Sequence, residues 1–283
     1  MTGKQVPSPS LQSLPQTSRG GRVVDFVVTM ACWSYFILGF LFFFSFLYGG
    51  AYCFSARREQ SFQNLNHLFF KGFLALLRIL SPRQEWRIDP NIGEIESSIV
   101  VCNHLSYLDP LIFISLFRRQ KTIVKTRFFQ TPVFGRVITN SGYLPATTEG
   151  IHGMRMIEQV EKMGEFLRLG GNLFVFPEGT RNREGSIGPL HKGVFKIARM
   201  QRCPIYVLSL CNTDRLFTPG KFLFNTRQKS TIEVTILDRI ELEAEHGRLS
   251  VVDLEKKVRE SFRVRTKSSD QEGRGSKQTE SMP

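Results

Sequence analysis

A histidine and an aspartate five residues apart are the side chains in this sequence best suited to proton transfer. His104 follows an apolar, β-branched run at residues 99–101, which predicts a strand, and Asp109 precedes Pro110, which is typical of a helix start. A histidine can remove a proton from a hydroxyl group near neutral pH, and a carboxylate on its other ring nitrogen fixes the tautomer. Since aspartate before proline is also typical of an N-cap, Asp109 can cap the helix, orient His104, or do both.

A second polar turn lies about 70 residues further on, where the apolar run at residues 172–176 ends in Pro-Glu-Gly-Thr-Arg. Gly179 permits a tight turn, and the guanidinium group of Arg181 can hold a phosphate through two parallel hydrogen bonds. The alternative is a solvated turn with a surface pair of Glu178 and Arg181. Ligands of α/β sheets collect beyond the carboxyl ends of the strands, where both turns are expected.

The elements that position these turns alternate along the chain. We expect strands at residues 98–102, 122–125, 172–176, 205–210 and 232–237, and helices at residues 110–117, 154–169, 194–200 and 251–264. This alternation predicts an α/β domain with a mostly parallel, buried sheet and flanking helices.

The segment before this domain is apolar enough to enter a membrane. Residues 26–56 contain no charged side chain, and residues 26–48 would span about 34 Å as a helix. The run is too long for the core of a signal peptide. A turn at Gly49-Gly50 would give a re-entrant anchor instead of a span. Orientation stays open, because arginines flank the run on both sides.

Residues 62–80 predict a second apolar helix with one polar stripe, formed by Asn64, His67, Lys71 and Arg78. This helix could lie in the membrane interface or form a core helix with one solvated edge. We therefore divide the chain into a disordered segment at 1–22, an anchor with an interfacial helix at 23–80, a catalytic domain at 81–264 and a disordered tail at 265–283.

The formal charge of +13 predicts anionic partners. We expect membrane lipids and phosphorylated substrates rather than nucleic acid, because no basic motif interleaved with aromatic residues is present. The five cysteines form no CxxC pair, which favours a reduced catalytic domain that faces the cytoplasm. The five histidines show no metal-ligand spacing, so we expect no metal.

Together the two turns resemble the lysophospholipid and glycerol-phosphate acyltransferase family, and are similar to those of 1-acylglycerol-3-phosphate acyltransferases. Asn103-His104-x4-Asp109 resembles the first block of that family, and residues 176–181 resemble the third. Looser similarity includes Lys125-Thr126-Arg127 and residues 142–145, and the resemblance covers roughly residues 60–240. In the fourth block, Val207 stands where the family commonly has a second proline.

The resemblance implies a role for each residue of the site. His104 would deprotonate the free hydroxyl of a lysophospholipid, most simply lysophosphatidic acid, and Asp109 would orient it. Fatty acyl-CoA or acyl-carrier protein would be the thioester co-substrate, with no further cofactor. The acceptor phosphate would be bound by Lys125 and by the turn that contains Glu178, Gly179, Thr180 and Arg181. The alternatives are another lyso-lipid acceptor, a membrane esterase using the same His/Asp pair, or a covalent route through Ser106.

Overall fold

The computed structural model describes residues 19–181, 188–244 and 247–264. The predicted disordered segments at 1–22 and 265–283 lie outside the described residues, except that residues 19–22 are helical. The first described helix therefore begins at Arg19, four residues before the start of the predicted anchor.

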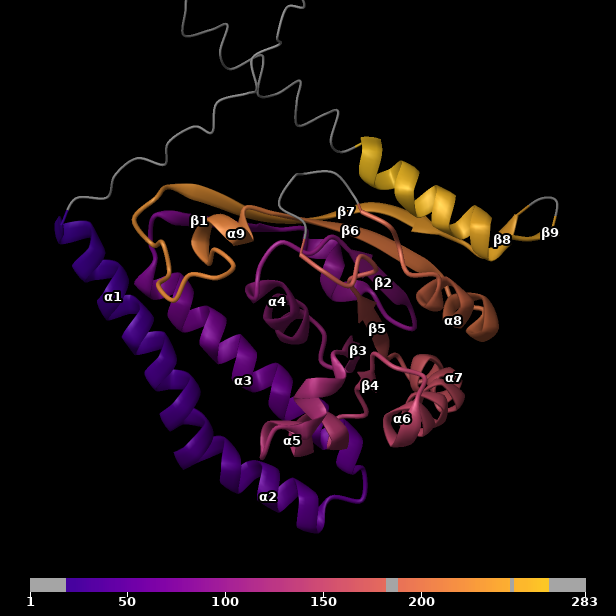
Figure 1. Ribbon diagram of the computed structural model, residues 1–283, viewed down its shortest axis with the longest axis horizontal. Coiled ribbons are helices and arrows are strands. Elements are labelled where there is room, and N and C mark those ends of the chain that lie inside the picture. Colours follow the sequence, from indigo (N-terminus) through magenta and orange to yellow (C-terminus); the bar gives the residue numbers. More distant parts are fainter. Residues whose placement is uncertain (1–18, 182–187, 245–246, 265–283) are drawn as a thin grey trace, which may run out of the picture.

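One continuous helical rod forms the N-terminal part of the structure (Figure 1). It consists of α1 (Arg19–Ser34), a π-helical segment η1 (Tyr35–Phe44) and α2 (Ser45–Phe54). The helix continues through Gly49-Gly50, so the alternative of a turn there is not adopted, and the chain reverses at residues 55–57 instead. Among the described residues, one helix, Gly21–Phe54, is long and apolar enough to cross a bilayer, with a mean hydropathy of 2.0.

The next helix, α3 (Arg58–Leu80), lies between this rod and α4 (Leu108–Leu116), as Figure 1 shows. Eight of its side chains are buried, including Phe69, Phe73 and Leu77. Its exposed edge includes Leu68, Lys71 and Ile79. One side of α3 thus packs into the core and the other is exposed, and its placement in a membrane interface stays a prediction.

A seven-stranded sheet forms the centre of the molecule, in the order β1-β7-β6-β2-β5-β3-β4. The strands from β6 to β4 are all parallel to one another, whereas β7 is antiparallel to β6. Their bounds are β1 (Gln84–Ile88), β2 (Ile99–Cys102), β3 (Gln120–Val124), β4 (Leu144–Pro145), β5 (Asn172–Val175), β6 (Ile205–Cys211) and β7 (Ser230–Ile240). The predicted mostly parallel α/β sheet is confirmed, with β1 and β4 as strands that the sequence did not reveal.

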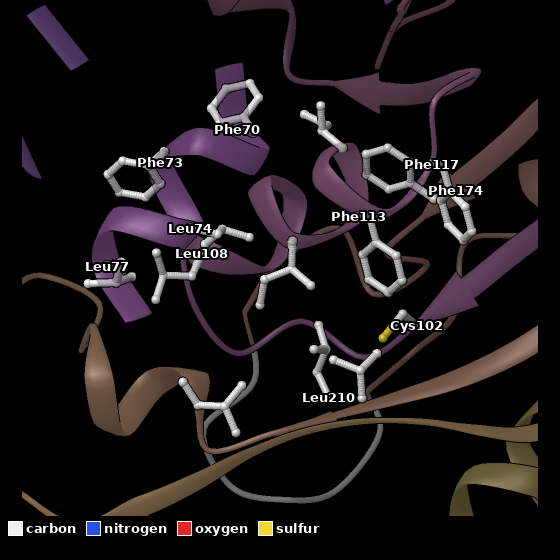
Figure 2. Packing of buried hydrophobic residues seen from close by; sticks show 14 of the residues in the cluster. Phe70, Phe73, Leu74, Leu77, Cys102, Leu108, Phe113, Phe117, Phe174 and Leu210 are labelled. Atoms are coloured by element: carbon white, nitrogen blue, oxygen red, sulfur yellow. The ribbon is translucent and has the colours of Figure 1, made fainter. Parts of the chain in front are cut away.

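Helices cover both faces of the sheet. Side chains of β2 alternate between the two faces: Val100 and Cys102 join the cluster with α3 and α4, whereas Ile99 and Val101 join the cluster with α7 (Met163–Arg168), α8 (Gly193–Gln201) and the helix at 251–264. Figure 2 shows part of the first cluster, in which Phe73 and Leu77 project from α3 and Phe113 of α4 lies beside Phe174 of β5. Because β2 is buried on both faces, its carboxyl end is held rigidly.

Shorter elements complete the described chain. They are η2 (Pro90–Glu94), η3 (Thr126–Gln130), α5 (Phe134–Asn140), α6 (Gly150–Glu161), α9 (Thr213–Leu216) and the hairpin of β8 (Glu243–Ala244) and β9 (Gly247–Arg248). The helix predicted at 154–169 is two helices, α6 and α7.

Candidate active site

The parallel register of the strands brings the predicted site residues to one edge of the sheet, the edge at which the parallel strands end. In β2 and β5, Val101 is paired with Val175, so the turn after β2 and the turn after β5 leave the sheet side by side. In β3 and β5, Thr122 is paired with Phe174, so Lys125 leaves the sheet at about the same level as Pro177. This edge is the carboxyl end of the parallel strands, where α/β proteins bind ligands.

His104 and Asp109 form a hydrogen-bonded pair at this edge. Nδ1 of His104 lies 2.8 Å from Oδ2 of Asp109, whose side chain is fully buried. A carboxylate only accepts hydrogen bonds, so Nδ1 carries a proton, and in the neutral imidazole the lone pair is on Nε2. The His104 side chain is 19% exposed, and its ring stacks on Phe176 at 4.4 Å. The imidazole is therefore fixed in both tautomer and plane while one edge stays accessible.

Asp109 is held by three further donors. Its Oδ2 accepts from the backbone N–H groups of Leu105 at 2.6 Å and Ser106 at 2.8 Å, and its Oδ1 accepts from Oγ1 of Thr213 at 2.6 Å. The helix α4 begins at Leu108, and its N-cap residue Tyr107 makes no side-chain cap. Of the alternatives for Asp109, the N-cap role is not the one adopted, because its carboxylate turns back toward residues 104–106 instead of capping α4.

Two residues that the sequence did not assign to the site support this turn. Thr213 opens α9, more than 100 residues after Asp109, and no local pattern connects them. Asn103 exchanges two hydrogen bonds with the backbone of Leu210 in β6: Nδ2 donates to the carbonyl at 2.9 Å, and Oδ1 accepts from the N–H at 2.8 Å. Asn103 therefore extends the β2–β6 pairing by one residue, and this pairing fixes the backbone directly before His104.

Ser106 is a structural residue in this turn. It is fully buried, its hydroxyl donates to the carbonyl of Phe217 at 2.8 Å, and it accepts from the N–H of Leu108 at 3.3 Å. A hydroxyl committed to a main-chain oxygen is not available as a nucleophile. The geometry thus disfavours the covalent route through Ser106.

The turn after β5 has the conformation that its glycine predicts. Gly179 has φ +64°, and an added Cβ would lie 2.7 Å from Nε2 of His191. Glu178 is buried and accepts from the N–H of Gly188 at 3.1 Å. Within the described residues no ion pair joins Glu178 to Arg181, so the turn is not the surface Glu/Arg pair of the alternative interpretation.

Arg181 lies on an aromatic ring, and among the described residues it forms no ion pair with a carboxylate. Its Cζ lies 3.7 Å from the centre of the Tyr107 ring, and its Nη1 is buried without a hydrogen-bond partner in the part of the chain that the structure describes. A buried guanidinium nitrogen without a partner is unfavourable, and an anionic ligand would satisfy it.

The other two predicted binding residues, Lys125 and Thr180, are exposed at the same edge. Lys125 follows β3, which is separated from β2 by β5. At a strand spacing of about 4.8 Å, its backbone lies roughly 10 Å from the start of the His104 turn. A lysine side chain can cover much of that distance.

Among the described residues, no group of three or more His, Cys, Asp or Glu side chains could hold a metal ion.

Residues 85–210, which form most of the sheet and carry both turns of this edge, match the family described as Acyltransferase. The predicted family resemblance is thereby confirmed. The match covers β1 to most of β6 and includes both turns of the site.

Two curated relatives agree with this class. The chain is 32% identical over 122 residues to the "1-acyl-sn-glycerol-3-phosphate acyltransferase BAT2, chloroplastic" of Brassica napus, covering 43% of this chain and 35% of that protein. It is 31% identical over 137 residues to a 1-acyl-sn-glycerol-3-phosphate acyltransferase of Borreliella burgdorferi, covering 48% and 54% of the two chains. This chain thus spans about a third to a half of these relatives' lengths.

A solved structure extends the likeness to the whole fold. The 1-acyl-sn-glycerophosphate (LPA) acyltransferase PlsC of Thermotoga maritima superimposes with a TM-score of 0.67, at 19% identity, over 88% of this chain and 98% of that chain. At this identity the likeness shows a shared fold, and it includes part of the N-terminal helices because the coverage exceeds the catalytic domain.

Proposed function

We propose that this protein transfers a fatty acyl group from a thioester donor to the free hydroxyl of a lysophospholipid, with lysophosphatidic acid as the acceptor and phosphatidic acid as the product. The observation that carries the proposal is the His104–Asp109 pair at the same sheet edge as Arg181, whose buried Nη1 has no hydrogen-bond partner among the described residues. The names of the curated relatives support the same acceptor class.

The reaction needs one base that later acts as an acid. Nε2 of His104 takes the hydroxyl proton as the acceptor oxygen attacks the thioester carbonyl. When the carbon–sulfur bond breaks, the imidazolium returns the proton to the leaving thiolate. Asp109 stabilises the imidazolium through Nδ1 and keeps its own position through Leu105, Ser106 and Thr213.

Cations at the edge bind the acceptor phosphate. In lysophosphatidic acid the reacting hydroxyl lies a few atoms from the phosphate, so a phosphate held by Arg181 leaves the hydroxyl near His104. Such orientation lowers the entropic part of the barrier. Lys125 adds a second positive charge, and the Gly179 turn brings the backbone close to the ligand. Glu178 orders the turn through Gly188.

We further propose that the N-terminal helix holds the enzyme on a membrane, with the catalytic domain on the cytoplasmic side. Only 17% of the most apolar window of Gly21–Phe54 is buried in the protein, which argues against an ordinary core helix. Its exposed side chains are large and apolar, and an apolar surface of this extent is typical of a membrane contact. They include Val23, Phe26, Val27, Ile37, Leu38, Leu41, Phe42, Phe43, Phe46 and Leu47.

The decisive experiment is an acceptor panel. The purified full-length chain, in detergent micelles, is incubated with radiolabelled acyl-CoA or acyl-carrier protein and with lysophosphatidic acid, three lysophospholipids that carry a head group, or glycerol 3-phosphate. We expect the largest kcat/KM with lysophosphatidic acid. Transfer to none of these acceptors would overturn the proposal.

The same assay separates the esterase alternative. An esterase would release free fatty acid at a rate that does not depend on the acceptor, because water replaces the lysophospholipid hydroxyl. We expect labelled phospholipid in large excess over labelled fatty acid when acceptor is present. The reverse ratio would favour the esterase.

A further inference from the structure

Tyr107 is a residue for which neither the motif nor the His/Asp pair supplies a role. It lies between His104 and Asp109 in the sequence, and its side chain is 47% exposed. An aromatic side chain this exposed gives little stabilisation through burial, so its position on the active-site turn needs another reason.

The ring of Tyr107 lies between two partners. The Arg181 guanidinium is 3.7 Å from its centre, and Phe217 packs against it at 5.9 Å. Phe217 is itself fixed, because its carbonyl accepts the Ser106 hydroxyl and its ring lies 4.5 Å from Phe224. Phe217 therefore restrains the Tyr107 ring, and the ring serves as a platform on which the Arg181 guanidinium rests.

A ring face is well suited to hold a phosphate-binding arginine. A cation stacked on an aromatic face is attracted by the ring quadrupole, yet its N–H groups point outward in the guanidinium plane and stay available. A carboxylate would instead occupy those N–H groups. The unpartnered Nη1 of Arg181 fits the first arrangement.

We propose that Tyr107 is a positioning residue that holds Arg181 at a fixed distance from His104 and so selects acceptors whose hydroxyl lies a few atoms from a phosphate. His104 and Tyr107 share one short turn, so the base and the platform for the phosphate ligand move together. This inference rests on the proposed acyl transfer to a phosphate-bearing acceptor.

The test compares two substitutions of Tyr107 by the KM for lysophosphatidic acid. Tyr107→Phe keeps the ring and should leave this KM within about twofold of wild type. Tyr107→Leu removes the ring, and we expect the acceptor KM to rise roughly 2- to 30-fold, the range that a cation–π contact supports. The KM for the acyl donor should not change in either variant.

A double substitution identifies Arg181 as the group through which Tyr107 acts. Arg181→Ala alone should raise the acceptor KM at least as much as Tyr107→Leu. Adding Tyr107→Leu to Arg181→Ala should raise it by less than about twofold, because the interaction is already lost. Multiplying effects would show that Tyr107 acts independently, which would overturn the inference.

Tyr52 provides a matched control. Its ring carries the guanidinium of Arg58 at 4.4 Å, and it is 51% exposed, but it lies at the end of α2. Tyr52→Leu should leave the acceptor KM unchanged. Circular dichroism checks that each variant folds, and Tyr107→Met replaces the leucine variant if that one does not.

The outcomes separate this inference from the function on which it rests. An active wild-type enzyme whose acceptor KM is the same in Tyr107→Leu would overturn the role of Tyr107 alone. A wild-type enzyme that acylates no phosphate-bearing acceptor would overturn the proposed function and this inference together.

Discussion

At the scale of single residues, the site depends on how firmly one carboxylate is held. Asp109 has no exposed surface and accepts four hydrogen bonds, of which His104 supplies one. The two backbone donors come from the residues directly after His104, so the carboxylate fixes both the imidazole and the turn that bears it. In the proposed mechanism the pair acts as a preorganised base, because these contacts leave little to move when a substrate binds.

The first prediction concerns the base itself. We expect His104→Ala to lower kcat by about 10²–10⁴-fold, the usual contribution of a general base. Binding to vesicles should persist, because the apolar helix is unchanged. His67→Gln is the control, since His67 lies on α3 and contacts the carbonyl of Ile114. Activity of His104→Ala within tenfold of wild type, measured with the best acceptor of the panel, would remove His104 from the mechanism.

The second prediction concerns Thr213. Thr213→Val keeps the shape of the side chain but removes the donor to Oδ1 of Asp109. A hydrogen bond to a charged group contributes about 1.5–3 kcal/mol, so we expect kcat to fall roughly tenfold or more while the acceptor KM stays constant. Thr213→Ser should restore kcat. A changed KM with an unchanged kcat would contradict a role through Asp109.

At the scale of elements, the segment between α9 and β7 connects the N-terminal rod to the active-site turn. Asp25 in α1 is buried and accepts from both the N–H and the hydroxyl of Thr226, at 2.9 and 2.7 Å. Trp33 stacks on Phe222 at 5.9 Å. The same segment begins with Phe217, which contacts Tyr107 and Ser106. Helix α1 is thus joined to the catalytic domain by specific polar contacts.

Removing the Asp25 carboxylate tests this connection. Asp25→Ala leaves two buried donors of Thr226 without a partner, at an expected loss of about 1–3 kcal/mol each. The thermal midpoint should fall by about 2–4 °C per kcal/mol lost. In Glu241→Ala, an exposed ion pair with Arg239 is broken, and the midpoint should hardly move. Equal midpoints for both variants, measured by differential scanning fluorimetry, would contradict a stabilising contact.

At the scale of the whole molecule, burial sorts the five cysteines by reactivity. None of the five is in a disulfide, and Cys53 is exposed, whereas Cys102 and Cys203 are buried. Burial raises the pKa of the Cys102 thiol well above its usual value and that of Cys203 to about 11. Both thiols stay protonated at pH 8, and a thiol reacts as its thiolate.

Alkylation therefore gives a test of the folded state. At pH 8, N-ethylmaleimide should label Cys53 fully before it labels Cys102 or Cys203. All five cysteines should react after denaturation in urea. Mass spectrometry of the digested protein measures each site. Early labelling of Cys102, which lies at the end of β2 next to the site, would show that the central sheet opens readily.

The sequence alone determined the local features of this protein. Runs such as residues 99–102, 172–175 and 205–211 are strands because β-branched and apolar residues are buried on both faces of a parallel sheet. The turns that follow the first two carry His104 and Arg181, and their sequences suffice to predict the family. Gly179 was predictable because its positive φ is a local property.

Only the tertiary structure decided how these local features meet. The pairing of Val101 with Val175 brings the two turns together, and nothing near either turn encodes that register. Thr213 and Phe217 reach the site through folding over more than 100 residues. The direction of the Asp109 carboxylate depends on those distant partners. A single sequence shows which groups can do chemistry, but their contacts depend on packing between segments that are far apart in the chain.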